Sequence, residues 1–142
     1  MYYFRAKGVA SDPLLDLSIG LAYLHRAMQR QADNRHTMIL QAMTYIFQYY
    51  RTYNEKSDKY GGRDGATMRQ AAEYNVGRAF HQIGLLTFAI QYYERAIGIS
   101  EDFGGLGKRD LVFETAHNLN LIYSLSGNYL AAKEITEKYL TL

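Results

Sequence analysis

The sequence predicts an all-α fold, a solenoid of about six helices that pair into three irregular hairpin repeats. The main observation is a phrase that occurs twice, 43 residues apart. Its copies are Asn75-Val76-Gly77-x-x-Phe80 with Gly84 and Ala89, and Asn118-Leu119-Asn120-x-x-Tyr123 with Gly127 and Ala132. Small residues, aromatics and turn glycines in one fixed order are typical of stacked helix hairpins. Only 1 proline and as many as 14 tyrosines fit helices that use aromatic rings to fill the space between them.

The first hairpin is predicted over about 13–56. Asp12-Pro13 is a helix start, with the carboxylate as cap and proline at the first helical position. The helix carries two apolar stripes, which predict packing on both sides: Leu14, Leu17, Leu21, Leu24 and Met28, and Ile19, Gly20, Tyr23 and Ala27. The polar run 30–36 interrupts it, with Asp33 or Asn34 as the next cap. A second helix then ends near Lys56.

Two polar, glycine-rich segments separate the remaining hairpins. Residues 57–65 are predicted to form an exposed, mobile loop, and residues 98–108 a second loop. Between and after them lie hairpins over about 66–98 and 109–142, with turns at Gly84 and Gly127. A chain of 142 residues with 48% hydrophobic residues is expected to form a single domain, 1–142.

The hairpins resemble the tetratricopeptide repeat (TPR), a unit of about 34 residues with a leucine–glycine pair, an aromatic, an alanine and a second aromatic. The middle copy matches with Val76-Gly77, Phe80, Ala89 and Tyr93. The last copy matches with Leu119, Tyr123 and Ala132, but has Asn120 in place of glycine and Thr136 in place of the second aromatic. The first copy is built on Ile19-Gly20, Tyr23, Ala42 and Ile46, with a lengthened first helix.

Catalytic, cofactor and metal sites are not predicted. The segment Gly104–Lys108 fails as a phosphate loop, because Asp102 stands where the first glycine belongs and Arg109 where Ser or Thr must follow the lysine. The 4 histidines never form an i, i+4 pair, there is no cysteine, and no serine lies in a G-x-S-x-G turn. A formal net charge of +2 argues against binding to a phosphate backbone, and no apolar run approaches the roughly 20 residues of a membrane span.

In TPR arrays the first helix of each pair lines a concave groove. We therefore expect a partner-binding groove lined by residues from all three hairpins: Leu17, Leu21, Leu24, Tyr74, Arg78, His81, His117 and Leu121. Its lining is half apolar, which favours a largely hydrophobic partner segment. The alternative is that the leucine stripe is merely core. A clamp for an acidic chain terminus is not predicted, because the positions that hold Lys, Asn and Arg in such clamps are occupied here by Leu17, Leu21, Glu114 and Asn118.

Longer stretches of the sequence make the resemblance more specific than the TPR pattern alone. Residues 12–23 (DPLLDLSIGLAY) and 75–90 (NVGRAFHQIGLLTFAI), together with His117–Tyr123 and the ending 138–142, resemble the C-terminal repeats of the TPR subunit of transcription factor IIIC. The resemblance implies a nuclear, non-enzymatic scaffold for RNA polymerase III transcription. It also implies that other factor IIIC subunits are the partners, whereas factor IIIB contacts belong to N-terminal repeats that are absent here.

The alternative is a helical-repeat module that binds nucleic acid. Base-reading repeats place polar residues at matching positions of successive units. Here Leu17, Tyr74 and His117 share one such position. A second position holds Leu21, Arg78 and Leu121. Neither set forms a readable code, so we expect weak binding or none.

Overall fold

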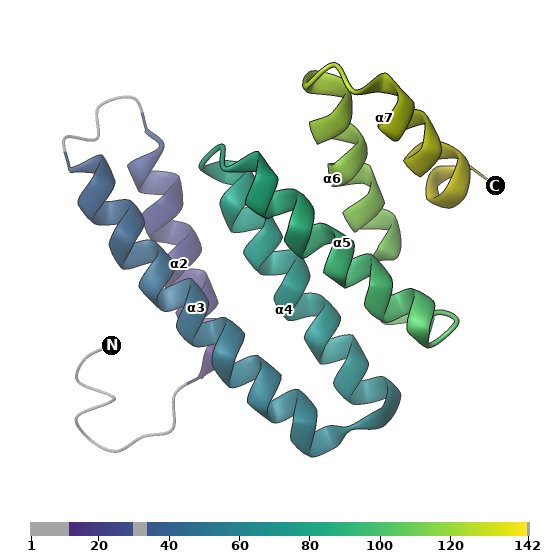
Figure 1. Ribbon diagram of the computed structural model, residues 1–142. Coiled ribbons are helices and arrows are strands. Elements are labelled where there is room, and N and C mark those ends of the chain that lie inside the picture. Colours follow the sequence, from purple (N-terminus) through teal and green to yellow (C-terminus); the bar gives the residue numbers. More distant parts are fainter. Residues whose placement is uncertain (1–11, 30–33, 142) are drawn as a thin grey trace. The chain divides into compact units, whose positions relative to one another are not determined.

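The computed structural model describes residues 12–29 and 34–141, and its described residues form helices and no strand (Figure 1). In chain order the helices are α2 (Pro13–Ala27), α3 (Arg35–Tyr60), α4 (Gly62–Gln82), α5 (Leu86–Asp102), the 3-10 turn η1 (Gly107–Arg109), α6 (Val112–Leu125), α7 (Tyr129–Ile135) and the π-helix η2 (Thr136–Leu140). The predicted all-α, TPR-like hairpin fold is confirmed. The proposed cap Asp33 lies outside the described residues. None of the described helices combines the length and the apolar character that crossing a membrane requires.

Contacts along the chain gather into two compact units, Met1–Tyr53 and Asn54–Leu142, where the sequence predicts one domain. Helix α3 continues through the boundary between them. The first unit contains α2 and most of α3. The second contains the end of α3 and everything that follows.

In the first unit, α2 and α3 form a hairpin around Gly20. The Asp12 carboxylate caps α2 by accepting a hydrogen bond of 3.0 Å from the Leu14 amide. A Cβ atom on Gly20 would lie only 2.5 Å from Ile46 Cγ1 and 3.0 Å from the Ala42 carbonyl oxygen. The absence of a side chain therefore lets the two helices approach. The residues of the predicted first repeat, Gly20, Ala42 and Ile46, do lie together.

The buried face of α2 differs from the predicted leucine stripe. Its buried residues are Pro13, Asp16, Gly20, Leu24 and Ala27. Leu14 is 56% exposed, whereas Leu17 and Leu21 are partly buried. The stripe drawn from the sequence is rotated from the packing face, because a helix with apolar residues on two sides does not reveal which side meets its neighbour.

The predicted loop 57–65 is wrong. Helix α3 continues to Tyr60 and α4 begins at Gly62, so Gly61 alone lies outside a helix. Gly61 and Gly62 have φ of 64° and 57°, a left-handed conformation that reverses the chain at once. Gly65 is buried, and a Cβ there would lie 2.5 Å from the Ser57 carbonyl oxygen. Gly61 and Gly62 therefore make a tight reversal and Gly65 allows close packing of α4 against α3, so the segment does not form a long loop.

The second unit repeats one hairpin design twice. In the first copy Gly77 of α4 lies against α5, and a Cβ there would be 2.7 Å from the ring of the buried Tyr93. Helix α4 ends at Gln82, and Gly84 (φ 82°) turns the chain just after it, where the Leu85 amide donates to the Phe80 carbonyl at 3.0 Å. Helix α6 ends at Leu125, and Gly127 (φ 81°) turns the chain in the same way, with the Asn128 amide donating to the Tyr123 carbonyl at 2.8 Å. The repeated phrase thus encodes a repeated helix stop.

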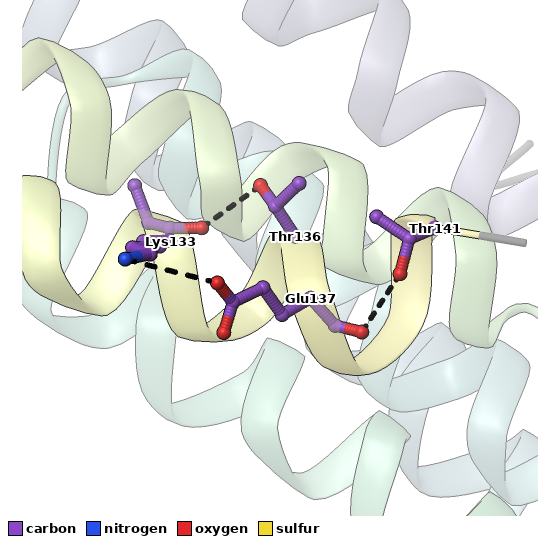
Figure 2. Close-up of polar contacts among 5 residues, drawn as sticks. Lys133, Thr136, Glu137 and Thr141 are labelled. Atoms are coloured by element: carbon purple, nitrogen blue, oxygen red, sulfur yellow. Dashed lines mark hydrogen bonds and ion pairs between the residues drawn. The ribbon is translucent and has the colours of Figure 1, made fainter.

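Asn120 and Thr136, the two residues of the last repeat that differ from the TPR pattern, contact each other. The Asn120 amide of α6 donates to the Ala132 carbonyl at 3.0 Å and to the Thr136 hydroxyl at 2.7 Å. Figure 2 shows Thr136 at the start of η2, with Lys133 and Glu137 forming a surface ion pair of 3.9 Å and the Thr141 hydroxyl turned back to the Glu137 carbonyl. A polar pair therefore replaces the contact of glycine with an aromatic ring.

The predicted loop 98–108 is shorter than expected. Residues 98–102 belong to α5, and Leu106 is buried at 5% exposure. The Asp110 carboxylate anchors the connection by accepting from the Ser100 hydroxyl at 2.5 Å and the Leu106 amide at 3.0 Å. It also accepts from the buried Gln70 side chain of α4 at 2.8 Å, so one acid ties α4, α5 and the start of α6 together.

Candidate functional site

Five of the eight predicted groove residues lie in the second unit. Tyr74, Arg78 and His81 are on α4, and His117 and Leu121 are on α6. Arg78, His117 and Leu121 are exposed, whereas Tyr74 and His81 are partly buried. The Asn118 amide of α6 reaches the Tyr74 hydroxyl at 3.4 Å, which brings these faces of the two helices together.

The other three predicted residues lie in the first unit. Leu24 is 0% exposed and belongs to the core of that unit, so it is wrong as a groove residue and the alternative of a core leucine holds for it. Leu17 and Leu21 are partly buried and stay predictions.

The buried Tyr93 of α5 reaches these residues through its hydroxyl, whereas the repeat pattern predicts it only as a packing residue. Its hydroxyl lies 3.3 Å from the Asn118 amide nitrogen and 3.1 Å from His81 Nδ1. Burial raises the pKa of Tyr93, with the neighbouring Tyr74 adding to the rise, so the phenol stays protonated. Burial lowers the pKa of His81, so its imidazole is neutral near pH 7. The Tyr93 hydroxyl can therefore donate to His81 Nδ1 while it accepts from Asn118.

Arg78 and Tyr74 complete this cluster. The rings of Tyr74 and Tyr93 lie 6.0 Å apart, and the Arg78 guanidinium carbon is 5.8 Å from the Tyr74 ring centre, within cation–π range. Arg78 forms no ion pair with any described residue. We name the set Tyr74, Arg78, His81, Tyr93 and Asn118 the tyrosine cluster. In the sequence, the feature that points to this cluster is Asn118, which opens the second copy of the repeated phrase.

Exposed apolar side chains flank the tyrosine cluster on α6. Leu121 is 40% exposed and Leu125, one turn later on the same side, is 84% exposed. Within residues 12–29 and 34–141, no group of three or more His, Asp or Glu side chains could hold a metal ion. The arrangement offers hydrogen-bond donors beside an apolar surface. Fold and surface together define a TPR-like helical-repeat protein.

The chain also matches known proteins. No family model matches it, but three curated relatives do. It is 43% identical to transcription factor tau subunit sfc4 of Schizosaccharomyces pombe over 98% of this chain, and 37% identical to the transcription factor tau 131 kDa subunit of Saccharomyces cerevisiae over 94%. It is 30% identical to human general transcription factor 3C polypeptide 3 over 92%. The chain belongs to the family of the TPR-containing subunit of transcription factor IIIC, and spans 12–14% of the length of these relatives.

Proposed function

We propose that this chain is a non-catalytic interaction scaffold of transcription factor IIIC, which docks another subunit of the complex in the nucleus during RNA polymerase III transcription of tRNA and 5S-type genes. Membership in the factor IIIC subunit family supports the general role. The tyrosine cluster supports a binding role, because it joins neutral aromatic hydroxyls, a neutral imidazole, an amide and a guanidinium, which can all donate hydrogen bonds to a partner.

The observation that carries the docking proposal is the exposed apolar row on α6. Leu121 and Leu125 stand on the side of α6 that also carries Asn118, whose amide reaches the Tyr74 hydroxyl, and the Arg78 guanidinium lies against the Tyr74 ring. Exposed apolar groups rimmed by polar ones are typical of protein interaction sites. A partner segment that covered this row would remove both leucine side chains from water.

Co-expression with each other factor IIIC subunit, followed by affinity purification, tests the proposal. We expect one subunit to co-purify with the wild-type chain and to be lost with Leu121→Asp. The matched control is Leu130→Asp, because Leu130 is 71% exposed but lies on α7. If no subunit co-purifies, or if the two variants behave alike, the docking proposal fails.

A titration with tRNA-gene DNA near physiological salt tests the alternative of a nucleic-acid module. A net charge of +2 releases few counterions, so we expect weak binding without sequence dependence. Tight, sequence-dependent binding would replace the docking proposal with the alternative.

A further inference from the structure

The hydrogen bonds of the tyrosine cluster determine where its protons point. The Asn118 amide donates to both tyrosine oxygens, at 3.4 Å to Tyr74 and 3.3 Å to Tyr93. Each hydroxyl hydrogen must therefore point elsewhere. The Tyr93 hydroxyl is buried and needs an acceptor, and His81 Nδ1 lies 3.1 Å away, so we assign the Tyr93 hydrogen to Nδ1 and the imidazole proton to Nε2.

Three donors are then left without an acceptor among the described residues. They are the Tyr74 hydroxyl, the His81 Nε2–H and the Arg78 guanidinium. Helix α4 carries all three, and they lie around the tilted ring pair of Tyr74 and Tyr93, with Arg78 against the Tyr74 ring and the His81 ring centre 5.9 Å from that of Tyr93. A surface that presents a cation and two neutral donors complements an anion.

The apolar row and Glu114 limit the kind of anion. Leu121 and Leu125 continue the surface toward the end of α6, which suits an apolar side chain of the same partner segment. Glu114 is exposed one turn before Asn118 on α6 and would repel a long run of acids. The surface therefore fits one carboxylate next to an apolar residue better than a polyanion such as DNA.

We propose that Tyr74, Arg78 and His81 bind an aspartate or glutamate side chain of a partner protein segment, whose neighbouring apolar residue lies on Leu121 and Leu125. This inference rests on the proposed function, because it names the chemistry of the docked segment. The carboxylate would accept from the guanidinium and from the free tyrosine or histidine donor, and both donors are already oriented by the cluster.

Selection from a displayed library of random linear peptides on the whole chain tests the proposal. We expect the enriched peptides to carry an Asp or Glu next to a large apolar residue. Changing that acid to its amide should weaken binding at least about tenfold, the loss typical of a hydrogen bond to a charged group. Arg78→Gln should cause a similar loss and Tyr74→Phe a smaller one, since Phe keeps the ring and removes only the hydroxyl donor.

Arg109→Gln is the matched control, because it removes the same charge from an exposed arginine in η1, outside the tyrosine cluster. Enriched peptides whose binding survives both Arg78→Gln and the change from acid to amide would overturn the proposal. So would a selection that yields no peptide sensitive to Arg78→Gln. Duplex DNA whose binding depends on Arg78 would assign the donors to a phosphate. Failure of subunit co-purification alone would remove the docking role and leave the carboxylate chemistry standing.

Discussion

Two helical glycines of the second unit sit in opposite surroundings. A Cβ on Gly77 would lie 2.7 Å from the ring of the buried Tyr93, whereas a Cβ on Gly98 would meet nothing within 4 Å. Gly77→Leu should overpack the contact of α4 with α5 and cost about 1–3 kcal/mol of unfolding free energy, despite the better helix propensity of leucine. Thermal melting measures this. An unchanged midpoint would mean that the contact is looser than described.

Gly98→Ala is expected to change stability in the opposite direction. Gly98 lies inside α5 and lines an open cleft of about 220 Å³ beside Leu119 and Ile135. A methyl group there meets no atom, so alanine should raise the unfolding free energy by about 0.5–1 kcal/mol through backbone entropy. Urea denaturation of the variant beside the wild type checks the sign.

Asp110 should make stability depend on pH. Burial alone would raise its pKa, but hydrogen bonds from Gln70, Ser100 and the Leu106 and Val112 amides outweigh burial and hold the pKa below its ordinary value of 3.8. Folding thus favours the charged form. The stabilisation is present above the ordinary pKa and is lost as pH falls through the lower folded value.

Asp110→Asn should therefore lower the unfolding free energy near pH 7, by about 1–3 kcal/mol for lost charged hydrogen bonds. Its difference from the wild type should shrink as the solution becomes acidic. Urea denaturation over a pH series measures both, with Asp102→Asn, an exposed acid at the end of α5, as control. A constant difference across the series would contradict the assignment.

At the scale of single residues, the sequence predicted packing better than polar networks. The close approach at Gly77 follows from the repeat pattern, because only a glycine admits the aromatic ring opposite. The role of Tyr93 did not follow, since a tyrosine at that position satisfies the pattern by its ring alone. Its hydroxyl becomes meaningful only when α6 places Asn118 against it.

At the scale of helices, the last hairpin offers a direct test of how one repeat can exchange its contact. Asn120→Gly should cost about 1–3 kcal/mol, because it removes the hydrogen bonds to α7 and η2 and adds a helical glycine. Thr136→Tyr should also destabilise, since its ring meets the Asn120 side chain. The double variant restores the glycine and aromatic of the middle repeat, so it should lose less than the sum of the two.

The expected coupling between these substitutions is about 0.5–3 kcal/mol in favour of the double variant, as for residues in direct contact. A double-mutant cycle by chemical denaturation measures it. Additive losses would show that the two positions are independent.

The sequence also predicted the helical hairpins and their turns at Gly84 and Gly127, because these glycines follow an aromatic at the same distance in both copies. It failed where glycine has another use. Gly61, Gly62 and Gly65 suggest a loop by composition, yet they make a one-residue connection with buried packing. Composition alone does not distinguish a glycine that frees the chain from one that lets two helices touch.

At the scale of the whole molecule, the second unit has a core of its own. The buried residues Ala89, Tyr93, Ile97, Ala116, Leu119 and Ile122 form one cluster within it. Residues 54–142 expressed alone should therefore unfold cooperatively, since their number is well above the roughly 40 at which a single core becomes insufficient. Circular dichroism melting and the dispersion of amide NMR signals measure this. A broad, non-cooperative melt would mean that the unit depends on residues 1–53.

The short connection at Gly61 has a consequence for proteolysis. Trypsin needs a basic residue in backbone that can be drawn into an extended strand, and exposed loops provide it. Lys56, Lys59 and Arg63 surround Gly61 but are all held in helices, whereas Lys108 and Arg109 lie exposed in the η1 turn. Within residues 34–141, the first cut should therefore separate α5 from α6 and leave α3 joined to α4.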